Sequence, residues 1–377
     1  MKKRNVLFSI VMCMLIVIML VPACTESTPT PTATAKPTAT ATGTATAKPT
    51  ATATPPPKVK KVAVNYGGTS ASSGGYASVV AEMNIIEKYS GETGVQVIPT
   101  IMETGASIEN LKLLKRGDCQ FGMAGMPGSY RAYNGLDEFE GMANPNLRIL
   151  LCNSTTGHSI FVTKESGVTT LEELEGKPFG CGLTGSETES VTVRFFDANN
   201  IKPNWFRGTT GAARDATLNR QIIGYVKSGL PDASVQEVAA SLPIRLLSIN
   251  QAQMDKAQAK YPGLFRSMVP MPPNVYPDSN PDGGWTFPIT MGEACNKDLP
   301  NDVAYAIVSA LLNHIPEWVA GYPTLKNPEC IGSEGPEVIL KYATIPLHAA
   351  TVRWFVENGY DVPENLIPPE YYETQGK

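Results

Sequence analysis

Residues 58–377 alternate short apolar runs with helical patterns, and this alternation limits the possible folds more than any other feature of the chain. A strand is expected over 58–66, a Gly/Ser-rich turn over 67–75 and a helix over 76–89. The same order of strand, turn and helix recurs along the chain. Such repetition predicts an α/β fold with a mostly parallel sheet.

The remaining elements are expected from the same patterns and from two capping boxes. Helices are expected over 107–115, from Thr169–Glu172 onward, from Ser186–Glu189 to Asn199, over 301–319 and over 348–359. Strands are expected over 95–101, 121–124, 147–152, 160–163, 177–182, 222–226, 244–249 and 287–291.

Three turns rich in Gly, Ser and Thr precede helix starts, at 67–75, 104–107 and 182–186. Free N–H groups and the helix dipole make such helix ends favourable for anions. Any one of these turns can simply cap its helix. Three of them at the strand ends of one sheet favour a crevice that binds a carboxylate or a phosphate.

The N-terminus has the pattern of an export signal. Lys2, Lys3 and Arg4 precede an apolar run over 6–21, and Cys24 follows shortly after it. The run is short for a membrane-spanning helix, which needs about 20 residues. We interpret residues 1–24 as a lipoprotein signal peptide and Cys24 as the lipid attachment site, with ordinary secretion as the alternative. Either way, the body is exported, and lipidation would anchor it to the outer face of the cytoplasmic membrane.

Residues 25–57 contain 13 Thr, 8 Ala and 7 Pro in 33 positions. Such a composition cannot build a core, so we expect a disordered, partly polyproline-like stalk. The body over 58–377 then carries 26 basic and 34 acidic residues and has no apolar run of membrane length. The acidic balance argues against nucleic acid as a partner.

Catalytic and cofactor motifs are missing from the sequence. Gly180–Gly185 matches the dinucleotide pattern GxGxxG, but the acidic residue expected about 20 residues on is absent near Trp205. HExxH, GxSxG, Walker A and CxxC motifs do not occur. We therefore predict no catalytic residues, no cofactor and no metal site.

The histidines and cysteines leave several interpretations open. His158 is expected at the start of a strand, from where it could face a cleft, and His314 is expected on an apolar helix face beside Leu311 and Leu312. The mature body has an odd number of cysteines, so at least one is unpaired. Cys152 and Cys181 are expected to be buried thiols. Cys295 and Cys330 could pair, but spacing does not decide it. The body's cysteines are Cys119, Cys152, Cys181, Cys295 and Cys330.

An ordered set of motifs resembles the TAXI family, the extracytoplasmic solute receptors of tripartite ATP-independent periplasmic (TRAP) transporters. The resemblance spans residues 60–358. Two segments depart from it: the first turn is richer in serine, and Gly125–Ser129 stands where many members carry Gln or Asp. The motifs lie at 65–76, 104–114, 117–123, 167–177, 182–189, 229–234, 243–247, 276–277 and 345–348.

This resemblance implies a type II periplasmic-binding-protein fold, with two α/β lobes that close on a small organic acid or amino acid similar to glutamate or 2-oxoglutarate. Lobe one is expected over 58–157 and 285–377, and lobe two over 158–284. The implied partners are the ligand and the membrane subunits of a TRAP transporter.

The predicted ligand-binding residues lie in the turns between strands and helices and offer hydroxyls, amides or backbone N–H groups. They are Thr69, Ser70, Ser73, Gly74, Thr104, Ser107, Asn110, Thr184, Gly185, Ser186, Thr188, Gly229 and Pro231. Two other classes remain as alternatives: a ligand-sensing lipoprotein without a transporter, and an enzyme on the same fold. The absence of a base beside a nucleophile disfavours the enzyme.

Overall fold

The structure is a computed structural model that describes residues 59–261, 264–265 and 267–374. The expected signal peptide, Cys24 and the stalk over 25–57 lie outside the described residues. The first strand, β1, begins at Lys60, and the last helix, α13, ends at Thr374.

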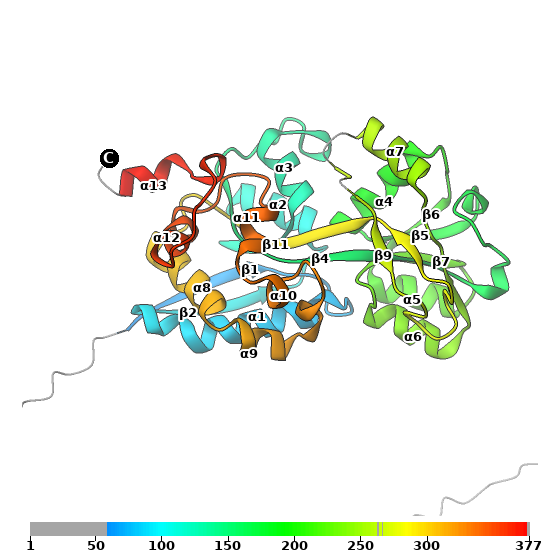
Figure 1. The fold of residues 1–377 in the computed structure, drawn as a ribbon, viewed down its shortest axis with the longest axis horizontal. Helices are drawn as coiled ribbons and strands as arrows, with labels where there is room; N and C mark the ends of the chain where they lie inside the picture. The colour runs from blue at the N-terminus through cyan, green and yellow to red at the C-terminus, as the bar shows by residue number, and fades with distance from the viewer. Residues whose placement is uncertain (1–58, 262–263, 266, 375–377) are drawn as a thin grey trace, which may run out of the picture. The chain divides into compact units, whose positions relative to one another are not determined.

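A nine-stranded sheet runs through the molecule in the order β2-β1-β3-β11-β4-β7-β5-β6, with β8 paired to β4 (Figure 1). A second pair, β9 (Val269–Met271) and β10 (Gly284–Thr286), is antiparallel. The strands of the main sheet are β1 (Lys60–Gly67), β2 (Val95–Met102), β3 (Phe121–Gly125), β4 (Leu147–Thr163), β5 (Pro178–Leu183), β6 (Asn204–Gly208), β7 (Gly224–Ser228), β8 (Ile244–Leu246) and β11 (Pro288–Asn296).

Only half of the strand pairings in this sheet are parallel, so the expectation of a mostly parallel sheet is wrong. The two outer groups, β2-β1-β3 and β7-β5-β6, pair in parallel. Strands β4 and β11 lie between them and pair antiparallel with each other and with their neighbours. The two strands expected at 147–152 and 160–163 are one continuous strand, β4.

Helices cover the sheet, and several of them were not expected. The expected helices at 76–89, 107–115, 186–199 and 348–359 correspond to α1, α2, α4 and α12. The helices are α1 (Gly75–Tyr89), α2 (Ser107–Arg116), α3 (Met126–Asn134), α4 (Glu187–Ala198), α5 (Thr210–Leu218), α6 (Ala233–Ser241), α7 (Gln251–Lys260), α8 (Asn301–Asn313), α9 (Ile315–Gly321), α10 (Ile331–Glu334), α11 (Glu337–Tyr342), α12 (Ala349–Glu357) and α13 (Pro369–Thr374).

Two helix predictions need correction. The helix expected over 301–319 is two helices, α8 and α9, that meet at a bend of 77°. Pro316 lies at the start of α9, where its ring cannot continue the preceding helix. The capping box at Thr169–Glu172 opens only a 3-10 turn over Glu172–Leu174, in which the Glu173 carboxylate accepts from the Thr169 and Thr170 N–H groups.

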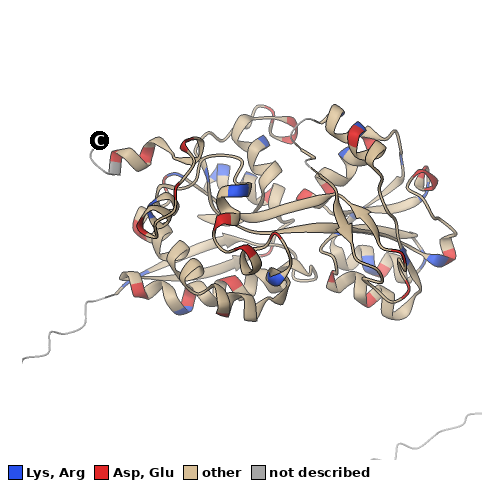
Figure 2. Ribbon diagram, viewed as in Figure 1, with Lys and Arg blue, Asp and Glu red and all other residues tan. Residues whose placement is uncertain are grey.

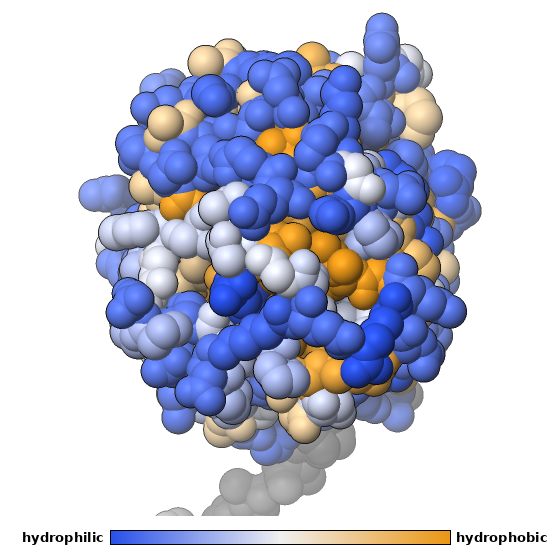
Figure 3. Space-filling model, turned by 90° about the vertical axis from the view of Figure 1, so that its right-hand side faces the viewer, coloured by the Kyte–Doolittle hydropathy of each residue, from blue (hydrophilic) through white to orange (hydrophobic). Residues whose placement is uncertain are grey.

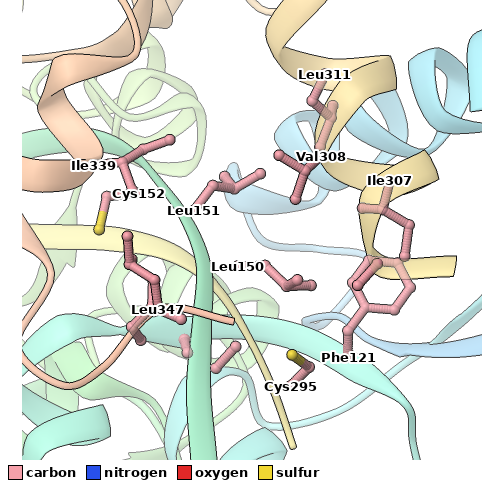
Figure 4. Close-up of a cluster of buried hydrophobic side chains, with 14 of the residues drawn as sticks. Phe121, Leu150, Leu151, Cys152, Cys295, Ile307, Val308, Leu311, Ile339 and Leu347 are labelled. Atoms are coloured by element: carbon pink, nitrogen blue, oxygen red, sulfur yellow. The ribbon is translucent and has the colours of Figure 1, made fainter. Parts of the chain in front are cut away.

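The apolar side chains form separate cores at the two ends of the sheet. The first core joins β1, β3 and the outer ends of β4 and β11 to α8 and α12, and Figure 4 shows Phe121, Leu150 and Val308 within it. At the other end, alternate residues of β4 face opposite sides: Ile160 belongs to one core and Phe161 to another. We call the two ends the first half (β1–β3, α1–α3 and α8–α13) and the second half (β5–β10 and α4–α7).

Charged residues lie mainly on helices and loops, while β4 and β11 are largely uncharged (Figure 2). The end of the molecule formed by the second half is mostly hydrophilic, with small apolar areas near its centre (Figure 3). Within the described part of the chain, no single helix is long and apolar enough to cross a bilayer. The bent pair α8 and α9 reaches that length and composition only when taken together.

Candidate binding site

A cavity of ≈ 300 Å³ lies between the two halves. The first half contributes the turn after β1 and the start of α2. The second half contributes the turns after β5 and β7. Residues of β4 and β11 complete the wall between them, including Ser154, Thr156, Ile289 and Met291. The cavity is therefore bordered by the three turns singled out in the sequence and by the two long strands.

Most of the predicted binding residues border this cavity. The first turn supplies a threonine, a serine and a glycine, and the other turns supply hydroxyls and a Gly-Leu-Pro wall. These lining residues are Thr69, Ser73, Gly74, Ser107, Ser186, Thr188, Gly229 and Pro231.

Asn110 and Thr104, by contrast, hold the backbone together beside the cavity. Asn110 is buried, and its Nδ2 donates to Gly67 O at 2.8 Å and to Met123 O at 2.9 Å. Thr104 Oγ1 donates to Gly68 O at 2.9 Å. These bonds join the ends of β1 and β3 to the loop before α2, so both side chains position the first turn.

Ser70, Thr184 and Gly185 also lie outside the cavity lining. Ser70 Oγ is 2.9 Å from Ser72 Oγ, and Thr184 is exposed. The Gly185 carbonyl accepts from the N–H groups of Ile108 at 3.1 Å and Glu109 at 3.2 Å. The N-terminus of α2, expected to offer free N–H groups to an anion, therefore has two of them occupied by the opposite half.

Ser186 caps α4, as its capping box predicts. Its Oγ accepts from Glu189 N at 3.1 Å. The Glu189 carboxylate accepts from Gly185 N at 2.7 Å rather than from the Ser186 N–H, so the reciprocal bond of the box is shifted by one residue. Ser186 thus has a structural role and also borders the cavity.

Lys227 is the main charged lining residue that sequence reasoning missed. It lies in β7 opposite Ser159 of β4 and is only 5% exposed. Its Nζ donates to Ser73 Oγ at 3.1 Å, across the cavity from the second half to the first. It forms no ion pair among the described residues, although Glu187, Asp232 and Glu293 border the same cavity. The signal was a lysine at the end of a buried strand, directly before the Ser-Gly-Leu-Pro turn.

A second missed group joins the halves beside the cavity. Arg131 of α3 donates to Glu187 Oε1 of α4 at 3.0 Å and to Glu138 Oε1 at 3.0 Å. Arg194 donates to Glu138 Oε2 at 2.7 Å. Burial raises the pKa of Glu187, and Arg131 opposes but does not cancel this shift. Burial also acts to raise the pKa of Glu138, but Arg131 and Arg194 together hold it below its usual value.

The glycines of Gly125–Ser129 accommodate Glu187. A Cβ on Gly128 would lie 2.2 Å from Glu187 Oε2, and one on Gly125 would lie 2.7 Å from Glu187 Cγ. A larger side chain at either place would displace the carboxylate. The segment where this sequence departs from the TAXI pattern is thus the surface against which Glu187 packs.

None of the three histidines borders the cavity. His158 is buried, with Nδ1 2.9 Å from Phe287 O, and burial lowers its pKa to about 4. His314 does not lie on an apolar face. Its ring stacks on Tyr89, and Nε2 is 3.1 Å from a Glu92 oxygen. All five cysteines in the described chain are buried, and Cys295 and Cys330 do not form a disulfide with each other.

Two α/β halves that share a pair of long central strands and enclose a cavity define a periplasmic-binding-protein-like architecture, and the α/β fold expected from the sequence is confirmed. The family model for the NMT1-like family matches residues 68–359, and the chain belongs to that family.

Several solved structures are similar to this chain. The alkanesulfonate-binding protein SsuA from Xanthomonas axonopodis pv. citri, bound to MOPS, is 14% identical with a TM-score of 0.42, covering 82% of this chain and 95% of that chain. The periplasmic binding protein BugD is 11% identical with a TM-score of 0.48, covering 80% and 99%. A protein from Bordetella bronchiseptica RB50 is 15% identical with a TM-score of 0.45, covering 83% and 96%.

Proposed function

We propose that the protein is an extracytoplasmic solute-binding protein that captures a small organic acid or amino acid and returns it chemically unchanged. The observation that carries this proposal is the cavity between the halves, in which Lys227 is the one lining cation in the described chain, among hydroxyl side chains and the acidic residues Glu187, Asp232 and Glu293. A buried cation needs an anionic partner or its hydrogen bonds filled, since a bare charge is costly to remove from water. A ligand carboxylate meets that need.

The carboxylate would lie near the first turn. Lys227 Nζ and Ser73 Oγ are 3.1 Å apart, and Thr69 and the start of α1 border the same space. The α1 dipole adds a favourable field for negative charge. Ser186, Thr188 and the Gly229–Pro231 wall would then contact the rest of the ligand. A cavity of ≈ 300 Å³ suits a molecule of the size of glutamate or 2-oxoglutarate.

Binding would use two lobes that close over the ligand. Lobe one comprises residues 58–157 and 285–377, and lobe two comprises residues 158–284. Support comes from the separate cores and from β4 and β11, which connect them. Thr155 Oγ1 and Thr290 Oγ1, 2.9 Å apart, pair these strands where the chain passes between the halves. Closure around a ligand of this kind is the usual working motion of two-lobed receptors.

The partners and location belong to the same proposal. The resemblance to the TAXI family favours delivery to TRAP transporter membrane subunits, and the sequence over 1–24 favours export with a lipid on Cys24. A sensing role without a transporter would use the same cavity. Catalysis is disfavoured because His158, whose Nδ1 is taken up by the backbone, lies away from the cavity hydroxyls.

Native mass spectrometry of the purified protein, followed by calorimetric titration with glutamate and 2-oxoglutarate, tests the proposal. We expect a co-purified or added acid to bind one to one and to be recovered intact. A new product formed from the bound acid, and lost in a Lys227→Met variant, would show an enzyme instead. No binding of any small acid would remove the carboxylate as the ligand class.

A further inference from the structure

Two buried carboxyl groups meet at the edge of the cavity. Glu82 comes from α1 and Glu293 from β11, and each is 1% exposed. Glu293 borders the cavity, while Glu82 lies behind it. The site described above does not use either residue.

The burial of this pair favours a proton. The two groups lie close enough for the charge of Glu82 to raise the pKa of Glu293. Each side chain is only 1% exposed, so two carboxylates here would repel each other away from water. Neither group forms an ion pair with a described lysine, arginine or histidine, and two unpaired charges at this depth would be very costly.

One oxygen on each group is left over. Glu82 Oε1 and Glu293 Oε2 are buried and have no hydrogen-bond partner among the described residues. Glu293 is the member that borders the cavity, so its carboxyl group is the one nearer to a bound molecule. A protonated oxygen there donates a hydrogen bond, and an ionised one repels an anion.

We propose that Glu293, supported by Glu82, is a specificity-determining residue: in its neutral, protonated form it donates a hydrogen bond from its carboxyl group to a ligand oxygen. This inference rests on the proposed function, because it assigns a role toward the same small acid. It makes the cavity selective for a hydrogen-bond acceptor at Glu293, while Lys227 binds negative charge of the ligand.

The groups around the pair fix the direction of its pH dependence. Tyr66 of β1 lies beside both carboxyl groups, and Cys119 lies beside Tyr66. The pKa values of Tyr66 and Cys119 are raised, so these two side chains are neutral at ordinary pH. Lys227, Asp232 and Glu187 face the cavity from the second half. Burial raises the pKa of Glu82 to about 8, and burial with the neighbouring Glu82 raises the pKa of Glu293 well above its usual value. The pair is therefore neutral at pH 7 and gains negative charge as pH rises beyond about 8.

Infrared difference spectroscopy on the ligand-free full-length protein tests directly whether Glu82 and Glu293 are protonated. At pH 7 we expect a carbonyl band of a protonated carboxylic acid that disappears above about pH 8. The band should be lost in the Glu82→Gln/Glu293→Gln double variant and kept in Glu364→Gln, a control far from the cavity. If the double variant leaves the protonated-carboxyl region unchanged at pH 7, the pair is ionised and the proposal is wrong.

Calorimetric titration with 2-oxoglutarate and with glutamate between about pH 6 and pH 9 tests the donor role. Wild-type affinity should stay level to about pH 8 and then fall. Glu293→Gln keeps a donor of similar shape, so it should bind at pH 7 within about threefold of wild type and lose the pH dependence. Glu293→Leu should lose about tenfold or more, because it removes the donor.

Three other results of the titrations would each overturn the donor role of Glu293, and they differ in what they imply for the proposed function. Binding with a flat pH profile overturns the donor role and leaves the proposed function intact. Affinity for glutamate that rises with pH shows an ionised Glu293 holding the ligand ammonium, and it also overturns the donor role. No binding of either acid at any pH overturns the proposed ligand class and this inference together, whatever the infrared result.

Discussion

At the scale of single residues, the charged side chains at the cavity are ones that the Gly, Ser and Thr turn motifs did not predict. Lys227 and Glu293 interrupt otherwise apolar or small-residue strands, and Glu187 follows the cap of α4. All are buried, so each needs a partner. Lys227 has a serine, Glu187 has an arginine, and Glu293 has another carboxyl. Lys227 and Glu293 lack a partner of opposite charge and border the cavity, so they indicate where a ligand binds.

Replacing Lys227 by Met should weaken binding of a small acid by about 1.5–3 kcal/mol, roughly 10- to 150-fold, the value of a hydrogen bond to a charged group. The ligand-free melting temperature should not fall, because the variant removes a buried charge and keeps the aliphatic stem. Calorimetric titration and thermal melts measure both quantities. Lys202→Met, at an exposed position, is the matched control. A lowered ligand-free melting temperature with unchanged affinity would make Lys227 structural.

The buried histidines predict acid sensitivity. Burial lowers the pKa of His158 and of His348 to about 4, below the usual 6.5, so both are neutral in the folded protein. Their contribution to stability is present above about pH 6.5 and is lost as pH falls toward 4, by up to about 3 kcal/mol for each. Urea unfolding across this range should show a shallower pH slope in His348→Asn than in wild type. Equal slopes would mean that His348 takes up its proton without cost to the fold.

At the scale of elements, the alternating pattern located most strands and the longer helices, because buried strands and amphipathic helices differ in period. It failed at β4. The polar run Asn153–Gly157 looked like a break between two strands, yet it is the part of one strand that passes the cavity. Helix α7 was missed for a related reason, since most of its residues are polar and only Gln253, Met254 and Ala257 are buried.

The turns could be predicted as the site because they are rich in Gly, Ser and Thr. The contacts that each turn residue makes in the folded protein could not be predicted.

Ser186 and Thr184 make this distinction testable. Ser186→Ala should lower the free energy of unfolding by about 1 kcal/mol through loss of the α4 cap. Thr184→Val should change neither stability nor affinity, since Thr184 is exposed and outside the cavity lining. Denaturant unfolding and titration compare the two. A clear affinity loss in Thr184→Val would restore the ligand contact expected from the sequence.

The contact between α3 and α4 predicts a large effect from one cation. Arg131→Met leaves Glu187 buried without its partner, which should cost about 3–5 kcal/mol of stability at pH 7. The double variant Arg131→Met/Glu187→Gln should recover part of this loss. Arg116→Met removes an exposed ion pair with Asp118 and should cost less than about 1 kcal/mol. A small loss in Arg131→Met, close to that of the control, would show that water reaches Glu187.

At the scale of the whole molecule, polar contacts between the halves surround the cavity. The Gly185 carbonyl bridges to α2, Arg131 reaches Glu187, Lys227 reaches Ser73, and Gly211 N donates to Ser72 Oγ at 3.2 Å. Each half has its own core, so breaking these contacts would leave both folded. In the proposed closing motion, β4 and β11 would bend where Thr155 and Thr290 face each other.

Closure is therefore measurable as a change in size. In solution without ligand we expect a radius of gyration larger than that of the structure described here, because polar contacts between the halves can be replaced by contacts with water when no ligand joins them. A saturating acid should lower the radius toward the value of the structure, because the ligand binds groups from both halves only when they are close. Small-angle X-ray scattering with and without ligand measures this change. Lys227→Met should need a proportionally higher ligand concentration for the same decrease, because compaction follows occupancy. Tight binding in wild type with no change in scattering would mean that the halves are already closed before the ligand arrives, and that entry depends on motion of the rim residues alone.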